Sequence, residues 1–331
     1  MAGDSHCMSF CRAVAYMITS LSILLTDRCN ISCDHCIIRA KKSGGLLFDV
    51  TYLDNLLEGL LYANIPYLGI TGGEPLLYPE LLKTICKELQ NIGITSIVAS
   101  NAFWASSYME ATKTVCFLKN VGVKKLIMSV DDYHMKYIPL KNISNAVNAS
   151  NEYKLEYQIV VSALNISRAV FYHTLLAEME IDNVYSGAIE RAGRAKDLIG
   201  QSYDDVELRL FKCLKVGHPI VLLNCNVVAC CDLLVAPEYE PQVDSPLHLG
   251  SIKNEPLKDI LNRASHSAVL TLIRDNGPDG IFAKLKDTFD RKSNELNPNH
   301  GCKLCSWLFA GKERANSVLD SFREHSNSIC G

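Results

Sequence analysis

Short apolar runs alternate with longer amphipathic segments from Leu21 to about Ala195. The runs resemble strands that are buried on both faces of a parallel sheet, and the segments between them carry apolar residues at helical spacing. The predicted strands are Leu21–Leu25, Tyr67–Thr71, Ile94–Ala99, Lys125–Val130 and Tyr157–Val161, and the predicted helices include Pro79–Gln90, Met109–Asn120 and Ile143–Tyr153. This alternation predicts βα units around a parallel sheet.

The number of these units predicts the fold class. About six βα units fit the available length, so we expect an α/β fold with a partial (β/α)6 barrel rather than the full eight units. Such folds place their chemistry at the carboxyl ends of the strands. We therefore look for functional residues directly after each apolar run.

The pattern changes after Ala195. Short apolar runs on either side of Asn224–Asn226 predict a hairpin, because Asn tolerates the left-handed backbone of a turn. Helices are expected at about Pro256–Arg263 and Gly280–Phe289. We expect an N-terminal extension at 1–20, the barrel at 21–200 and a small, cysteine-rich α+β domain at 201–331.

Composition narrows the class of protein. The chain has 331 residues, a formal net charge of −3 and no block of Lys or Arg, so we expect no nucleic-acid partner. The apolar stretch Ala13–Leu25 is too short to span a bilayer and lacks the flanks of a signal peptide, so we expect no membrane partner. Fourteen cysteines in a chain of this size suggest metal binding in a reducing cytoplasm rather than a disulfide framework.

Three cysteines lie within eight residues, at Cys29, Cys33 and Cys36, shortly after the first predicted strand. Three thiolates on one loop can hold three corners of a [4Fe–4S] cluster, whereas complete ligation takes four. Structural zinc sites instead combine two distant pairs, so this spacing is a poor match to zinc. The spacing favours a cluster with one open iron.

Polar residues follow the other predicted strands. Gly72 and Gly73 allow close approach of the backbone to a ligand, and Glu74 can accept a charge-assisted hydrogen bond from an ammonium group. Ser100, Asn101, Ser129 and Asp131 could bind a ligand or cap the following helices. His134 could be an acid or base, or a structural hydrogen-bonding residue.

These motifs resemble the radical S-adenosylmethionine (SAM) superfamily, in its Cys-x3-Cys-x2-Cys loop and its Gly-Gly-Glu segment. The resemblance implies that Cys29, Cys33 and Cys36 hold a [4Fe–4S] cluster whose open iron binds SAM. It also implies that Gly72, Gly73, Glu74, Ser129 and Asp131 contact SAM. His35 occupies a place where the family often has an aromatic ring near the adenine.

The C-terminal cysteines are similar to those of SPASM and Twitch auxiliary-cluster domains. The resemblance implies that Cys213, Cys230, Cys302 and Cys305 hold an auxiliary [4Fe–4S] cluster, although a structural zinc would accept the same four thiolates. Cys225 stands where the family has glycine, which makes Cys225 and Cys231 rival ligands. The scarcity of later cysteines favours the single-cluster, Twitch-like form.

The resemblance implies a radical SAM enzyme that abstracts a hydrogen atom from its substrate. Crosslinking or epimerisation of a ribosomal peptide is the favoured reaction, and oxidation, epimerisation or rearrangement of a small molecule is the alternative. A low-potential electron donor such as a flavodoxin or ferredoxin is the implied partner. A non-enzymatic electron-transfer or zinc-stabilised protein remains the competing class.

Overall fold

The computed structural model describes residues 18–190, 192–198, 213, 215–285 and 301–330. Several sequence-based expectations lie outside this part of the chain. They include the extension before residue 18, the apolar run at 210–212 and the end of the helix expected at Gly280–Phe289.

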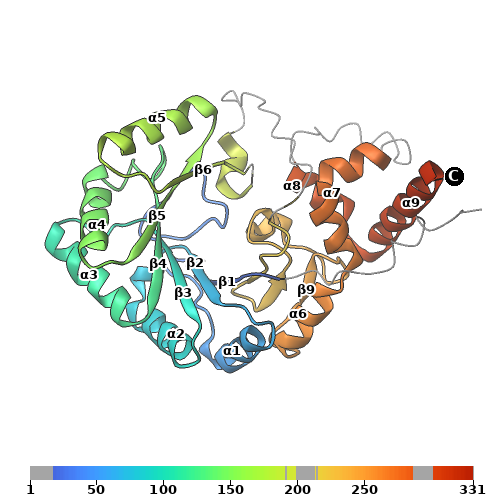
Figure 1. Cartoon of the computed structure of the whole chain (residues 1–331), viewed down its shortest axis with the longest axis horizontal. Coiled ribbons are helices and arrows are strands. Elements are labelled where there is room, and N and C mark those ends of the chain that lie inside the picture. Colours follow the sequence, from blue (N-terminus) through green and yellow to red (C-terminus); the bar gives the residue numbers. More distant parts are fainter. Residues whose placement is uncertain (1–17, 191, 199–212, 214, 286–300, 331) are drawn as a thin grey trace, which may run out of the picture.

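The described N-terminal part consists of six parallel strands, with an α-helix after each of the first five, as the alternating pattern predicts. Its strands are β1 (Leu21–Thr26), β2 (Tyr67–Gly72), β3 (Thr95–Ser100), β4 (Val123–Ser129), β5 (Glu156–Ala163) and β6 (Val184–Ala188). Its α-helices are α1 (Leu53–Tyr62), α2 (Pro79–Asn91), α3 (Tyr108–Asn120), α4 (Leu140–Glu152) and α5 (Ile166–Glu178). The helices lie outside the curved sheet (Figure 1). The prediction of a partial (β/α)6 barrel is confirmed.

The amphipathic helices explain why the sheet is covered on its outer side. In α2, the buried residues are Leu82, Ile85, Cys86 and Leu89, which recur at the spacing of one helical face. Pro79 occupies the first turn, where the lack of an N–H costs little. The strands that these helices cover are apolar, and the residues Leu21, Ile23 and Leu25 of β1 have no exposed surface.

The C-terminal part (the described residues from 213 to 330) continues the same sheet. It contributes β7 (Ile220–Val221), β8 (Asn226–Val228) and β9 (His248–Ser251), and the strand order is β6-β5-β4-β3-β2-β1-β7-β8-β9. The β7 strand pairs in parallel with β1, whereas β7, β8 and β9 pair antiparallel. The hairpin expected around Asn224–Asn226 is therefore present, and it extends the sheet that begins in the barrel.

Helices complete the C-terminal part. They are α6 (Leu257–Ser265), α7 (Ala268–Leu285), which is kinked at Gly277, α8 (Gly301–Leu308) and α9 (Lys312–Cys330). Short 3-10 helices lie at Val50–Tyr52, Pro75–Leu77, Gly193–Leu198, Leu233–Val235 and Pro237–Tyr239. The α6 helix packs on α1, where a Cβ on Gly59 would come within 2.5 Å of Leu257.

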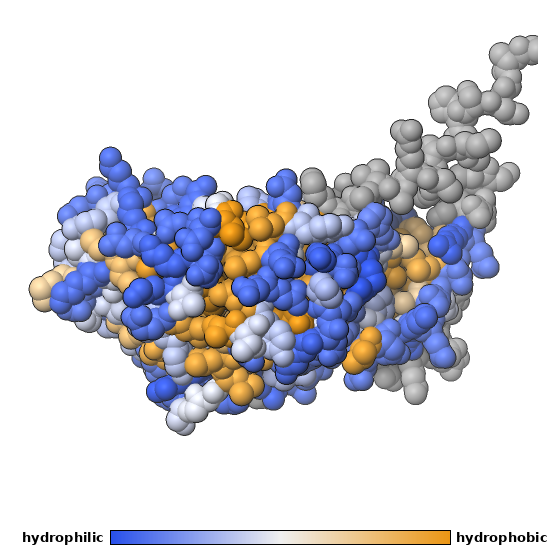
Figure 2. Space-filling view, turned by 90° about the horizontal axis from the view of Figure 1, so that it is seen from below, coloured by the Kyte–Doolittle hydropathy of each residue, from blue (hydrophilic) through white to orange (hydrophobic). Residues whose placement is uncertain are grey.

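The face that α1 occupies carries exposed apolar side chains. Viewed from below Figure 1, hydrophobic residues gather in the middle of the surface, with polar regions on either side (Figure 2). Leu61 of α1 is 53% exposed, and Leu46, Leu47 and Val50, which precede this helix, are also exposed. Within the part of the chain that the structure describes, no helix is both long and apolar enough to cross a membrane.

Candidate functional site

The three clustered cysteines lie on the loop that follows β1, at the carboxyl end of the sheet. Cys29 and Cys33 are buried, and Cys36 is partly buried. The loop folds back on itself, since the backbone N–H of Cys29 donates to the carbonyl oxygen of Lys41 (2.8 Å) and that of Cys36 donates to Cys33 (3.2 Å). The N–H of Ala40 lies 3.4 Å from Sγ of Cys36. All three thiols therefore belong to one compact loop.

The electrostatics of this loop fit a bound cationic cluster. Burial raises the pKa of Cys29 to about 11 and raises that of Cys33 further. Negative charge on the other cysteines of the loop adds to both shifts. Two buried thiolates and a third that is partly buried would repel one another without a metal, whereas iron would favour their ionised form. The loop thus suits the iron–sulfur cluster that the spacing predicts.

Gly72 and Gly73 bring the end of β2 against the backbone that follows β1. Gly72 has φ of 138°, and a Cβ there would lie 2.3 Å from the carbonyl oxygen of Thr26. A Cβ on Gly73 would lie 2.0 Å from the carbonyl oxygen of Arg28. Both positions therefore require glycine, because any side chain would collide with backbone. The predicted SAM-contacting segment is thereby held beside the cysteine loop.

Glu74 is completely buried, and its carboxylate accepts three hydrogen bonds. Oε1 accepts from the N–H of Leu76 (3.0 Å) and the hydroxyl of Ser100 (2.9 Å), while Oε2 accepts from the N–H of Asn101 (2.8 Å). Burial raises its pKa to about 7, although these hydrogen bonds oppose the shift. The carboxylate thus joins the ends of β2 and β3, and its contact with a SAM ammonium group stays a prediction.

Asp131 and Ser129 lie at the end of β4. Ser129 is half-buried. Asp131 is fully buried and accepts from the backbone N–H groups of Tyr133 and His134, both at 3.0 Å, while its Oδ2 lies 2.9 Å from Nδ1 of His134. Burial raises the pKa of Asp131, but the hydrogen bond and charge of His134 outweigh it, so the pKa lies below its usual value. A negative charge therefore stands close to the cysteine loop.

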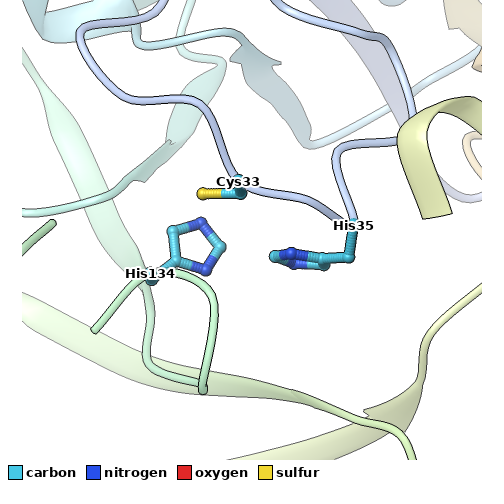
Figure 3. Close-up of side chains that lie close together, drawn as sticks. All are labelled: Cys33, His35 and His134. Carbon is cyan, nitrogen blue, oxygen red and sulfur yellow. The ribbon is translucent and has the colours of Figure 1, made fainter. Parts of the chain in front are cut away.

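His35 and His134 meet beside Cys33. The ring of His35 is 5.1 Å from that of His134 and 4.7 Å from that of Tyr133. Figure 3 shows both imidazoles near the Cys33 sulfur, and ligand atoms of these three residues lie within 4.8 Å of one another. Nδ1 of His35 is buried without a hydrogen-bond partner among the described residues. This unsatisfied atom is a further sign that the site accommodates a bound group.

Two contacts of the cysteine loop were not predicted from the sequence. Nδ2 of Asn101 donates to Oδ1 of Asn30 (2.9 Å) and lies 3.7 Å from Sγ of Cys29. Arg194 donates to the carbonyl oxygen of Cys33 (2.8 Å). From the sequence, Asn101 is expected only to bind a ligand or cap a helix, and no role is expected for Arg194. Both residues support the cysteine loop instead.

A cavity opens next to the cysteine loop. Its volume is about 540 Å³, and the loops after β1, β3 and β4 border it. The lining residues are Asn30, Ile31, Phe103, Ser106, Tyr137, Ile138, Pro139, Lys141 and Asn142. The cavity gives the cysteine loop access to solvent.

The four C-terminal cysteines come together in space. Cys302 and Cys305 lie one helical turn apart on α8, and charges on Cys230 and Cys213 both influence Cys305. Cys230 in turn influences Cys302. Burial raises the pKa of all four thiols, so a metal would again favour the thiolates. The charges of these thiols act on one another, which places them near each other, and their ligation of an iron–sulfur cluster stays a prediction.

Of the two rival ligands, Cys225 has different surroundings from these four, whereas Cys231 shares theirs. Cys225 is buried on the hairpin turn with φ of 70°, and the charged groups that influence it are Lys253 and Asp49. This left-handed backbone explains why the similar domains have glycine at the position. Cys231 is exposed, Lys215 and Asp232 influence both its thiol and that of Cys213, and its own charge influences Cys230, so it stays a rival ligand.

Carboxylates surround the second group of cysteines. Oxygens of Glu190, which follows β6, and of Asp232 lie within 4.8 Å of each other and of Sγ of Cys302. Burial, with the charge of Asp232 added, raises the pKa of Glu190 to about 7. Lys215 lies 3.7 Å from Asp232 and offsets part of the negative charge. The residue that follows the last barrel strand therefore borders the second cysteine group.

Comparisons with known proteins agree with this geometry. The profile of the radical SAM superfamily matches residues 23–174. The chain is 27% identical to YydG of Bacillus subtilis, a protein named for a provisional role in peptide biosynthesis, over 93% of this chain and 97% of YydG. It is also 26% identical to a GTP 3′,8-cyclase of Aquifex aeolicus, over 88% of this chain and 82% of that enzyme.

A solved structure supports the fold. The crystal structure of SuiB from Streptococcus suis bound to S-adenosylmethionine superposes with a TM-score of 0.51 at 14% sequence identity. The match covers 75% of this chain and 66% of the SuiB chain. At this level of identity the superposition establishes the shared fold alone.

Proposed function

Because the profile of the radical SAM superfamily matches residues 23–174, and members of that superfamily are enzymes that reductively cleave SAM, we propose that this chain is such an enzyme and that it abstracts a hydrogen atom from a ribosomally made peptide. The buried cysteine loop beside Gly72–Glu74 is the observation that carries the proposal. The peptide substrate is supported by the similarity to YydG, which extends over nearly the whole of both chains. Crosslinking and epimerisation are both compatible with this chemistry.

Three thiols would hold the SAM-binding cluster: those of Cys29, Cys33 and Cys36. When bound, the reduced [4Fe–4S] cluster supplies one-electron cleavage of the SAM sulfonium, which yields a 5′-deoxyadenosyl radical. The protein holds the ligands on one loop, with Cys29 and Cys33 buried and Cys36 partly buried. The cofactor would thus supply the radical reaction, and the protein would bind and orient the cofactor and the substrate.

The residues proposed to contact SAM are Gly72, Gly73, Glu74, Ser129 and Asp131. The two glycines let the end of β2 pack directly on the backbone that leads into the cysteine loop, because no side chain fits there. The buried carboxylates of Glu74 and Asp131 provide negative charge that suits the ammonium and sulfonium groups of SAM.

We further propose that Cys213, Cys230, Cys302 and Cys305 hold an auxiliary [4Fe–4S] cluster in a domain that spans 201–331. This auxiliary cluster would take up an electron from the substrate radical or bind the substrate. A low-potential donor such as a flavodoxin or ferredoxin would supply the electron for SAM cleavage. Both roles are compatible with the predicted reducing cytoplasm.

A small-molecule substrate is the alternative, and the similarity to GTP 3′,8-cyclase supports it. The two proposals differ in what the reaction consumes. After anaerobic loading with iron and sulfide, the protein is incubated with SAM, a reductant and either candidate peptides or small molecules such as GTP.

We expect 5′-deoxyadenosine and a peptide of altered mass or stereochemistry, detected by liquid chromatography and mass spectrometry. Conversion of a nucleotide or sugar with untouched peptide would replace the substrate proposal. Absence of 5′-deoxyadenosine in every reaction would contradict the proposed SAM cleavage.

A further inference from the structure

Arg194 lies against the cysteine loop, although about 160 positions separate it from Cys33. Its Nε donates to the carbonyl oxygen of Cys33 and its Nη1 to that of Ala40, both at 2.8 Å. Its backbone N–H donates to the carbonyl oxygen of Cys36 at 3.0 Å. One residue thus bonds to three points along the segment that carries two of the three cysteines.

Gly193 allows this close approach. Its φ is 59°, and a Cβ would lie 2.4 Å from the carbonyl oxygen of Cys36 and 2.2 Å from that of Ile37. A larger residue would push the segment away from the loop, because the colliding atoms belong to the backbone.

The same segment also contacts the C-terminal part. The N–H of Gly193 donates to Oε1 of Glu238 (2.8 Å), and the guanidinium of Arg39, in the loop, donates to the same oxygen (3.4 Å). A small packing cluster joins the two regions. Its members are Ala192, Ala236, Ile37, Tyr239 and Cys302. The residue after Cys36 and one predicted auxiliary ligand therefore share a packing cluster.

We propose that Arg194 is a positioning residue for the SAM-binding cysteines, and that Glu238 makes this positioning depend on the C-terminal part. A guanidinium is a planar, pre-organised fork of donors, so it can fix several carbonyls at once. Groups that hold metal ligands in place change metal affinity or activity when they are lost. The role rests on the proposed function for its catalytic consequence, whereas the loop geometry stands independently.

The first test needs no cluster and no activity. Hydrogen–deuterium exchange of the full chain is measured for wild type, Arg194→Gln and Arg263→Gln. Arg263 is a matched control, because its guanidinium also donates to a backbone carbonyl, that of Leu249, but it lies on α6. We expect faster exchange at 29–41 only in Arg194→Gln, with a melting temperature close to wild type. Wild-type exchange in Arg194→Gln would overturn the proposal.

The second test uses the loaded protein. We expect Arg194→Gln to lower the yield of 5′-deoxyadenosine by about 10- to 100-fold and to weaken the change that SAM causes in the electron paramagnetic resonance spectrum of the reduced cluster. Arg194→Lys keeps the positive charge and one donor nitrogen, so it should recover part of both. It also carries the test if Arg194→Gln fails to fold. Unchanged yield and spectrum in both variants would overturn the role.

Glu238→Ala tests the dependence on the C-terminal part. We expect it to increase exchange at 29–41 by less than Arg194→Gln does, because it removes the partner of Gly193 and Arg39 but not the bonds of Arg194. Wild-type exchange in Glu238→Ala would overturn the dependence. If the wild type itself fails to cleave SAM, the proposed function is wrong, while the exchange data still decide on the positioning.

Discussion

The two cysteine sites are built in opposite ways. Cys29, Cys33 and Cys36 share one loop, whose backbone hydrogen bonds shape it locally. Cys213, Cys230, Cys302 and Cys305 come from segments far apart in the chain, and only the last two share a helix. The first site depends on local sequence together with a few distant contacts, such as those of Asn101 and Arg194, whereas the second depends on the tertiary structure of the whole C-terminal part. Variants at the two sites should therefore fail differently.

The largest effect is expected from Cys29→Ala. It leaves two thiolates on the loop, which is too few for the cluster, so formation of 5′-deoxyadenosine should fall to background. Circular dichroism should show an intact fold, because the sheet does not depend on this thiol. Cys116→Ala, on α3 and outside both sites, is the control and should keep full activity. Substantial cleavage of SAM by Cys29→Ala would mean that the cluster has other ligands.

Cys302→Ala should separate the two sites. The first three cysteines are intact in this variant, so we expect it to keep most SAM cleavage but to lose conversion of the peptide. The iron content should drop by roughly half if each site holds four irons. Elemental analysis and product analysis of the same sample check both expectations. Unchanged iron content would show that Cys302 is not a ligand.

Glu74 provides a pH test of the first site. Its pKa is raised from 4.5 to about 7, so the folded state binds the proton more tightly than the unfolded state. The resulting stabilisation is present below pH 4.5 and is lost as the pH rises through about 7. The loss amounts to about 3 kcal/mol.

Urea unfolding of the iron-free chain at pH 4.5 and 8 measures this difference. The free energy of unfolding should fall between these pH values by about 3 kcal/mol more in wild type than in Glu74→Gln, which cannot titrate. If the free energy of unfolding changed equally with pH in the two proteins, the pKa of Glu74 would not be raised in the folded state.

The smallest effect is expected from Cys225→Ala. Its thiol faces Lys253 and Asp49 rather than the other four cysteines, so the iron content should equal that of wild type. Loss of the buried sulfur should cost about 1 kcal/mol in the free energy of unfolding. A drop in bound iron would identify Cys225 as a ligand.

Much of the fold could be predicted from the sequence, because hydrophobic periodicity is a local property. The predicted strand Tyr67–Thr71 differs from β2 by one residue, and the helix Met109–Asn120 differs from α3 by one. The pairing of β7 with β1 could not be predicted, since two residues in a strand carry little pattern. The packing of α6 on α1 could not be predicted either, because it joins residues far apart in the chain.

The site shows the same division. The cysteine loop and Gly72–Glu74 were recognisable because their chemistry is contained in short motifs. The hydrogen bonds between Ser100 and Glu74, and between Arg194 and the loop, join different βα units. The sequence identifies such residues as polar, but it does not indicate the partners to which they form hydrogen bonds. Supporting residues are thus harder to find than ligands.

The parallel pairing of β7 with β1 has a consequence for any attempt to divide this protein. Ile220 and Val221 occupy the free edge of the strand that leads into the cysteine loop. Truncation before β7 would leave that edge unpaired, and unpaired edges invite aggregation. A chimera that takes its C-terminal part from a relative would have to supply a matching strand at this position. Exchange of the C-terminal part between relatives would therefore have to preserve the pairing of β7 with β1, and joining the two parts at a linker would not be enough.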